Sequence, residues 1–262
     1  MFDAPDPATA EALARLYDLD LEDDPGDLDL YLALAARADG TILELAAGSG
    51  RLAVPLAAAG HPLTAVDLDP AMIERGRARA VHAGLPDGRL TWVAADLTDL
   101  HLPDEGSFAF GFLALNSIML LPTREAQRAA LRTLAGHLAS GGLAAVDVWL
   151  PDADDLARFD GRVILEWPRT DPETGEVVTK AGSAIHDAAT NTITLTSIYE
   201  QGRQGGAVQR WVRRDRLRLV SADELASFAV DAGLEVEHIA GGYDLSGIGP
   251  GSERAVLVAV RP

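Results

Sequence analysis

Three groups of residues that could bind a ligand lie at the ends of apolar segments. Residues 44–51 (ELAAGSGR) form a glycine-rich turn between an expected strand and an expected helix. Glycine lets a ligand approach the backbone closely, and the first N–H groups of a helix attract a carboxylate or phosphate. Asp67 and Asp96 end the next two apolar segments, where their carboxylates could accept hydrogen bonds from ribose hydroxyls and an adenine amine. These positions predict a pocket for a ligand that contains ribose and adenine.

The glycine turn alone is open to other interpretations. Gly48, Gly50 and Ala53 fit the pattern G-x-G-x-x-A of dinucleotide-binding proteins, and Asp67 lies near the expected offset. Glycine turns after strands also occur without any nucleotide. The carboxylates at the ends of the following strands favour a binding site.

Alternating strands and helices must position these residues. Strands are expected at 41–46, 63–67, 90–95, 108–115 and 143–150. Helices are expected at 51–59, at 70–83 and from Thr123 to about Ser140, where Gly141 and Gly142 would end the last of them. This alternation predicts a parallel sheet that is covered on both faces.

The pattern changes after Pro151. Residues 161–220 contain β segments at 162–167, 182–187, 192–201 and 207–219, which suit an antiparallel sheet. A helix from Ser221 to about Ala232 and strands at 236–240 and 254–260 follow. We therefore expect an N-terminal helical segment (1–40), an α/β core (41–150), a β-rich insertion (151–220) and a C-terminal part of the core (221–262).

Composition narrows the classes of function. The chain has 40 acidic and 22 basic residues among 262, a formal net charge of −18, and no cysteine. Nucleic acids and anionic membranes bind basic surfaces, so neither is an expected partner. The lack of cysteine excludes disulfides and thiolate nucleophiles, and no metal site is expected. Residues 1–10 show no secretory signal and no apolar run is long enough for a membrane span, so a cytoplasmic location is expected.

Together, these motifs resemble the class I S-adenosylmethionine-dependent methyltransferases, over most of the chain. Glu44-x-Ala46-x-Gly48-x-Gly50 is similar to the E-x-G-x-G-x-G loop of that family. The resemblance implies a Rossmann-like fold with a seven-stranded, mostly parallel sheet whose last strand is antiparallel, and S-adenosylmethionine as cofactor. It implies that Glu44 positions the amino group of the cofactor and that Arg51 lies near its carboxylate. The implied cofactor-binding residues are Tyr17, Glu44, Ala46, Gly48, Ser49, Gly50, Arg51, Asp67, Leu68, Met72, Asp96, Leu97 and Leu115.

Two positions depart from the family pattern. Ala46 replaces the first glycine of the loop, which alanine can do if its φ stays negative. Relatives that methylate amines often carry a histidine shortly after the segment that matches Asn116-Ser117, whereas leucine occupies positions 120 and 121 here. With leucine at 120 and 121, the resemblance implies no specific amine substrate.

Acceptor-binding residues are harder to choose than cofactor-binding ones, and no catalytic base stands out. The candidates are Tyr31, Asn116, Trp149, His186, Arg218 and Tyr243. His186 is the histidine that we would consider as a base, although a solvated strand residue is the simpler interpretation. Arg210, Arg214, Arg216 and Arg218 would share one face of a strand, which could bind an acidic substrate, face solvent or contact a second copy in a homodimer.

The leading hypothesis is a methyltransferase that transfers a methyl group to an oxygen or nitrogen of a small molecule by in-line displacement, with S-adenosylhomocysteine as product. The alternatives are a dinucleotide-dependent oxidoreductase and a protein that binds S-adenosylmethionine without catalysis. The oxidoreductase explains the glycines but leaves Asp96 and the reversed last strand unexplained.

Overall fold

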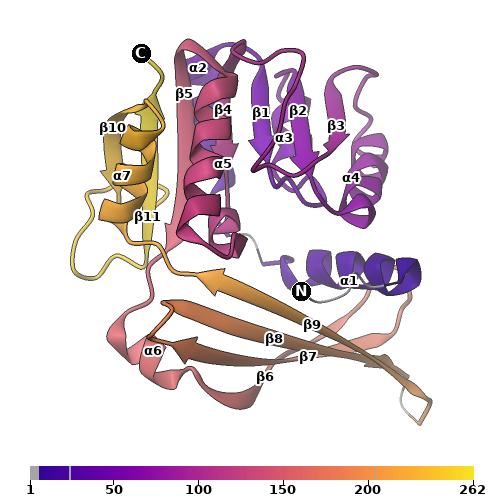
Figure 1. Cartoon of the computed structure of the whole chain (residues 1–262). Coiled ribbons are helices and arrows are strands. Elements are labelled where there is room, and N and C mark those ends of the chain that lie inside the picture. The colour runs from indigo at the N-terminus through magenta and orange to yellow at the C-terminus, as the bar shows by residue number, and fades with distance from the viewer. Residues whose placement is uncertain (1–5, 24, 204) are drawn as a thin grey trace. The chain divides into compact units, whose positions relative to one another are not determined.

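The computed structural model describes residues 6–23, 25–203 and 205–262. The chain divides into two compact units, drawn in Figure 1. One consists of residues 24–150 and 220–262 and is called the core unit below. The other consists of residues 1–23 and 151–219 and is called the sheet unit. Residues 1–5, at the start of the expected N-terminal segment, lie outside the described residues.

The core unit contains a seven-stranded sheet in the order β10-β11-β5-β4-β1-β2-β3. Its strands are β1 (Ile42–Leu45), β2 (Leu63–Asp67), β3 (Leu90–Ala94), β4 (Phe108–Leu113), β5 (Leu138–Trp149), β10 (Glu235–Ala240) and β11 (Arg254–Val260). Strands β1 to β5 pair in parallel, whereas β11 runs antiparallel to both β5 and β10. The expected fold class is confirmed, including the reversed last strand.

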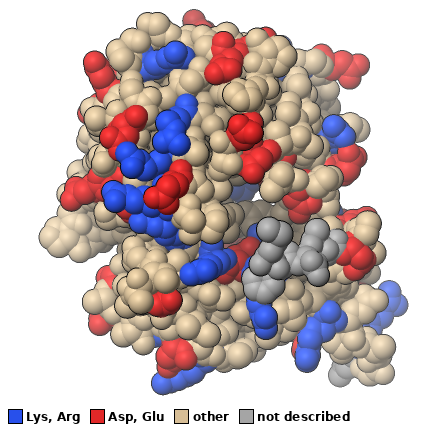
Figure 2. Space-filling view, in the orientation of Figure 1, with Lys and Arg blue, Asp and Glu red and all other residues tan. Residues whose placement is uncertain are grey.

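Helices cover both faces of this sheet. They are α2 (Leu28–Ala38), α3 (Ala53–Ala58), α4 (Pro70–His82), α5 (Arg124–His137) and α7 (Ala222–Asp231), with a short 3-10 helix η1 (Ser117–Leu120). Figure 1 shows α5 and α7 in front of the sheet and α2 and α3 behind it. Figure 2 shows acidic and basic side chains side by side over α5 and α7, where Arg124 pairs with Glu224 and Arg128 with Asp231.

The end of α5 differs from the prediction. The helix ends at His137, and Gly141 and Gly142 lie inside β5 instead of terminating a helix. A Cβ on Gly142 would lie 2.9 Å from the carbonyl oxygens of Ala139 and Phe108. The glycine pair therefore allows a close approach between backbones at an irregular point of the strand pairing.

The sheet unit contains four antiparallel strands in sequential order: β6 (Asp160–Thr170), β7 (Val177–Asp187), β8 (Thr192–Gly202) and β9 (Val208–Arg218). These strands correspond to the four predicted β segments, and most of them are longer than predicted. Helix α1 (Pro7–Asp20) and the short helix α6 (Ala153–Arg158) complete the unit. The sequence analysis did not predict α6.

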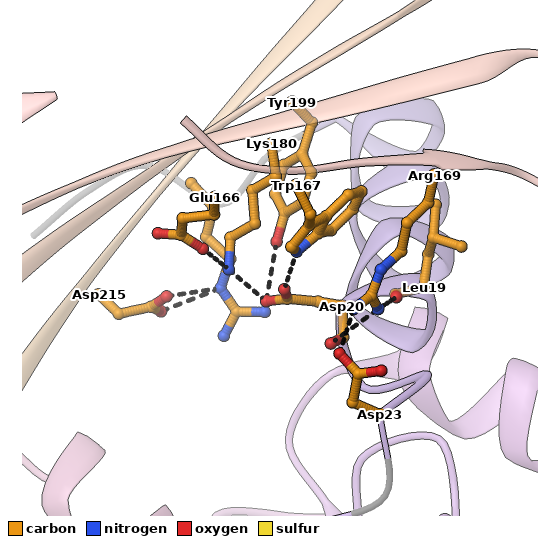
Figure 3. A network of polar contacts seen from close by, with 10 residues as sticks. Leu19, Asp20, Asp23, Glu166, Trp167, Arg169, Lys180, Tyr199 and Asp215 are labelled. Carbon is orange, nitrogen blue, oxygen red and sulfur yellow. Dashed lines mark hydrogen bonds and ion pairs between the residues drawn. The ribbon is translucent and has the colours of Figure 1, made fainter. Parts of the chain in front are cut away.

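Helix α1 packs on one face of the four-stranded sheet. Leu16 and Leu19 of the helix form an apolar cluster with Val178 and Tyr199 of the strands. The last residue of the helix, Asp20, accepts hydrogen bonds from Trp167 Nε1 at 3.0 Å and Lys180 Nζ at 2.5 Å (Figure 3). Both apolar and charged contacts thus hold α1 on this sheet.

None of the helices in the described ranges is both long and apolar enough to cross a membrane.

Candidate functional site

The carboxyl ends of the parallel strands in the core unit bring together most of the residues predicted to bind a ligand. Glu44 lies on β1, and the glycine turn follows that strand directly. Asp67 is the last residue of β2, which pairs with β1. Because neighbouring parallel strands end at the same edge of a sheet, the carboxylates and the turn form one continuous site.

In the turn after β1, every second residue has a left-handed backbone conformation. Ala46, Gly48 and Gly50 have φ angles of 57°, 55° and 77°. The condition under which alanine would fit easily at position 46, a negative φ, is therefore not met. The hydrogen bond from Ala47 N to Val66 O, at 3.0 Å, ties the turn to β2 and holds Ala46 in this conformation. A non-glycine residue with positive φ costs about 1–2 kcal/mol, so the turn is strained at this point.

Space is available directly beside the turn. A Cβ built on Gly48 would meet no atom within 4 Å, whereas a Cβ on Gly50 would lie 2.8 Å from the Trp92 ring. Ser49 between them is buried. Gly48 thus leaves an open surface where a ligand can contact the backbone, and Gly50 is required by packing.

Glu44 carries an unsatisfied buried atom. Its side chain is 3% exposed, and its Oε2 has no hydrogen-bond partner among the described residues. Burial raises the pKa of Glu44 to about 8, with the nearby Arg51 opposing that shift. A buried carboxyl group with a vacant acceptor is costly for a folded protein, and it suits a ligand that brings a cation or an N–H donor.

Arg51 is bound by a residue that the sequence analysis missed. Its two terminal nitrogens contact the two carboxylate oxygens of Asp27, each at 2.6 Å. Asp27 is fully buried just before α2. This bidentate pair links the start of α2 to the glycine turn and places one cation between Asp27 and Glu44. An acidic residue after Gly26 in an acidic segment gave no distinguishing signal in the sequence.

Asp67 faces the glycine turn. Its Oδ2 accepts a hydrogen bond from Gly48 N at 2.7 Å and its Oδ1 accepts one from Asp69 N at 2.9 Å. Burial raises the pKa of this carboxyl group despite these bonds. Leu68, the next residue, is 70% exposed, and Met72 is buried on α4. The exposed leucine beside a half-buried carboxylate offers an apolar surface next to a hydrogen-bond acceptor.

Asp96 and Leu97 follow β3 as expected. The Oδ1 of Asp96 accepts hydrogen bonds from Thr98 N at 2.8 Å and Thr98 Oγ1 at 2.7 Å. These bonds lower the pKa of the Asp96 carboxyl group, so it stays ionised and fixed in direction. The side chain is exposed and can accept a further hydrogen bond from a ligand.

A strained turn follows β4. Leu115 and Asn116 have φ angles of 51° and 64°. The side-chain oxygen of Asn116 accepts a hydrogen bond from Trp149 N at the end of β5. Asn116 and Trp149, both predicted to bind the acceptor, are therefore in contact with each other.

A buried carboxylate lies beneath this turn and links two further predicted acceptor residues. Asp147 of β5 is fully buried and accepts hydrogen bonds from Tyr31 Oη at 2.7 Å, Leu115 N at 2.8 Å and Tyr243 Oη at 3.2 Å. Arg254 Nη1 lies 3.6 Å from its Oδ2. The sequence signal for Asp147 was a single acidic residue inside the apolar run 143–150, since buried acidic residues need partners.

The three remaining candidates, Tyr17, His186 and Arg218, lie in the sheet unit. The ring of Tyr17 on α1 stacks with the Arg213 guanidinium, whose carbon is 5.4 Å from the ring centroid. His186 Nε2 is buried and has no hydrogen-bond partner among the residues that the structure describes. Arg218 donates a hydrogen bond to Leu219 O. Their roles as ligand-binding residues stay predictions.

The arginines of β9 alternate as predicted. Arg210, Arg214, Arg216 and Arg218 occupy every second or fourth position of a continuous antiparallel ladder, so they share one face. Arg210 pairs with Glu200 across the strands and its side chain is 65% exposed. At least this arginine has its charge balanced within the unit and is exposed to solvent.

Metal ligands are absent from the described part of the chain: residues 6–23, 25–203 and 205–262 contain no group of three or more His, Asp or Glu side chains that could hold an ion.

Comparison with known proteins agrees with this geometry. Residues 42–142 match a family model described as "Methyltransferase domain". An uncharacterized protein of Mycobacterium tuberculosis is 49% identical over 47 residues, which are 18% of this chain and 17% of that relative. The chain thus spans under a fifth of the length of this curated relative.

Solved structures match nearly the whole chain. An S-adenosylmethionine-dependent methyltransferase from Clostridium acetobutylicum is similar with a TM-score of 0.79 and 14% identity, covering 95% of this chain and 97% of that chain. CalS10 from Micromonospora echinaspora is an amino pentose methyltransferase solved with bound S-adenosylmethionine. It is similar with a TM-score of 0.69 and 19% identity, covering 94% of this chain and 97% of that chain. Residues 42–142 therefore match a methyltransferase domain, and the chain has the fold of the class I S-adenosylmethionine-dependent methyltransferases.

Proposed function

We propose that the protein is an S-adenosylmethionine-dependent methyltransferase that acts on a small molecule. The observation that carries this proposal is the buried Glu44 carboxyl group beside the glycine turn, with an oxygen that has no partner among the described residues. The cofactor brings an ammonium group, which is the donor that this oxygen lacks. Glu44, Gly48, Asp67 and Asp96 would hold the cofactor.

The charges around the turn favour this cofactor over a dinucleotide. Glu44, Asp27 and Asp67 surround the turn with three carboxyl groups, and Arg51 is paired with Asp27 through both terminal nitrogens. A pyrophosphate would have to displace Asp27 from Arg51 and lie beside the Asp67 carboxyl group, which opposes binding. A ligand that carries cationic groups is attracted by the same environment.

The chemistry needs little from the protein beyond alignment and exclusion of water. When bound, S-adenosylmethionine supplies an electrophilic methyl group on a sulfonium that is its own leaving group. The strained turn at Leu115 and Asn116, fixed by Asp147 and Trp149, would form a rigid wall for positioning the acceptor. We assign no general base, and an oxygen or nitrogen nucleophile both fit this proposal.

A small-molecule acceptor is supported by two observations. CalS10, which is similar over nearly its whole length, is an amino pentose methyltransferase. The net charge of −18 opposes binding of nucleic acid. An acidic protein of this kind is better suited to a neutral or cationic acceptor, so hydroxylated and aminated small molecules both belong in the first screen.

Calorimetry with S-adenosylhomocysteine tests the cofactor assignment, with NAD and NADP as controls. Micromolar binding of S-adenosylhomocysteine alone is expected, and replacing Asp67 by Ala should abolish it, whereas Glu11→Ala on the exposed side of α1 should not. Binding of a dinucleotide instead would refute the proposal. Release of S-adenosylhomocysteine during acceptor screening then separates an enzyme from a protein that only binds the cofactor.

A further inference from the structure

The turn after β4 adopts a conformation that its sequence does not favour. Ser117 N donates a hydrogen bond to Ala114 O at 3.1 Å, and both central residues, Leu115 and Asn116, have positive φ. Two positive φ angles are typical of a type I′ turn, where asparagine and glycine are common. Asn116 fits this preference, but Leu115 is a branched apolar residue with an unfavourable backbone angle.

A contact from Asp147 compensates for the unfavourable backbone angle of Leu115. Its carboxylate accepts the Leu115 N–H at 2.8 Å, which fixes the direction of the peptide group that enters the turn. The carboxylate is held in turn by Tyr31 of α2 and by Tyr243 of the loop between β10 and β11. Arg254 donates to the Tyr243 oxygen and lies within 3.6 Å of Asp147. Three segments far apart in sequence therefore meet at one buried carboxylate.

We propose that Asp147 is a positioning residue that holds Leu115 and Asn116 in the left-handed conformation which the ligand site requires. This inference rests on the proposed function, because Leu115 is one of the residues implied by the family resemblance to bind the cofactor. Strain at a functional site persists only where surrounding contacts determine it, and Asp147 makes such a contact. Its action passes through the Leu115 peptide and involves no direct contact with the reacting atoms.

An alternative role for Asp147 would be its negative charge. The two roles predict different effects of Asp147→Asn, because asparagine keeps one oxygen that can accept the Leu115 N–H but carries no charge. The two roles also predict different effects of a change at residue 115. Glycine adopts a positive φ without strain, so a Leu115→Gly background should reduce the need for Asp147 only if Asp147 acts on the turn.

The experiment combines Asp147→Asn, Asp147→Ala and Leu115→Gly in a double-mutant cycle. Affinity for S-adenosylhomocysteine is measured by calorimetry, and deuterium uptake of the peptide covering residues 114–120 by mass spectrometry. We expect Asp147→Ala to weaken binding and to speed uptake by about tenfold each, and Asp147→Asn to change either by less than about threefold. In the Leu115→Gly background, Asp147→Ala should cost less than about threefold. Glu11→Ala, at an exposed position of α1, is the control and should change neither the affinity nor the deuterium uptake.

Two results would overturn the inference. If Asp147→Asn is as damaging as Asp147→Ala, the charge matters and the contact to Leu115 does not. If the Leu115→Gly background brings no relief, Asp147 does not act through the turn. Should Asp147→Ala fail to fold, the inference requires that Leu115→Gly restore folding, and failure of both variants contradicts it. A wild-type protein that does not bind S-adenosylhomocysteine would refute the proposed function instead, while deuterium uptake still decides the role of Asp147.

Discussion

Binding of the proposed cofactor should release a proton from Glu44. In the protein without ligand, burial raises the pKa of Glu44 to about 8. At pH 7 about nine-tenths of the Glu44 carboxyl groups are then protonated. The α-amino group of S-adenosylhomocysteine is mostly protonated at this pH, and pairing with it favours the ionised carboxylate. If binding returns the pKa of Glu44 to its usual range, about 0.9 proton leaves for each ligand bound.

Calorimetry at pH 7 in phosphate and in Tris measures this number directly. Tris takes up protons with much more heat than phosphate, so binding of S-adenosylhomocysteine should be more exothermic in Tris. Glu44→Gln serves as the control, since glutamine cannot ionise and should remove the difference between buffers. Equal heats in the two buffers for the wild-type protein would refute the reasoning, as would an unchanged difference in Glu44→Gln.

The same group links stability to pH. A carboxyl group whose folded pKa lies above its unfolded value of 4.5 stabilises the fold in its protonated form. That contribution is present below about pH 4.5 and is lost as the pH rises through 8. The thermal midpoint of Glu44→Gln without ligand should therefore fall less than that of the wild type between pH 5 and pH 8. Glu44 thus lowers stability at neutral pH where it improves binding.

Three further predictions concern the scaffold. Replacing Ala46 by Gly should raise the free energy of unfolding by up to about 1 kcal/mol. Glycine removes the strain of a positive φ at this position, and its greater freedom in the unfolded state partly offsets that gain. An unchanged or lower thermal midpoint would contradict this prediction. Gly76→Ala places a Cβ 2.2 Å from the Trp92 ring and should lower the free energy of unfolding, measured with denaturant, by about 1–3 kcal/mol. In a Trp92→Leu background the same change should stabilise the protein, because alanine has a higher helix propensity than glycine. Asp20→Asn removes one of the two carboxylates that pair with Lys180, the sole lysine of the chain, and leaves Glu166 as its remaining partner. Native-state cleavage by a lysine-specific protease should accelerate about tenfold, and an unchanged rate would show that α1 does not depend on this contact.

Local sequence patterns were sufficient to predict most elements of both units, with the short helix α6 as an exception. Asp69 caps α4 with Pro70 at its first position, and Thr123 caps α5, both as the sequence indicates. These features depend on neighbours within one turn of the chain. The boundary between α5 and β5 was wrong because Gly141 and Gly142 can end a helix or permit close contact between strands. Only the pairing of β5 with β4 and β11 decides between a helix end and a strand contact, and part of that pairing involves residues remote in sequence.

Polar partners within the site were not predictable in the same way. A carboxylate at a strand end could be placed from the pattern, as with Asp67, because strand direction alone determines the edge that it occupies. Asp27 and Asp147 act through residues 24 and 32 positions away, Arg51 and Leu115. No spacing rule relates residues that far apart, so only the folded structure identifies these pairs.

The pairing of Arg51 also changes the role that the family resemblance implied for it. Both terminal nitrogens contact Asp27, so a ligand carboxylate would have to compete with a buried, bidentate partner to bind them. The positive charge still acts on Glu44, whose pKa it lowers against the effect of burial. Without Arg51, Glu44 would lie near two carboxylates with no compensating cation, and its ionisation on binding would be more costly. Arg51 therefore keeps the pKa of Glu44 low enough that an incoming ammonium group can ionise the carboxyl group, even though the nearby Asp27 acts in the opposite direction.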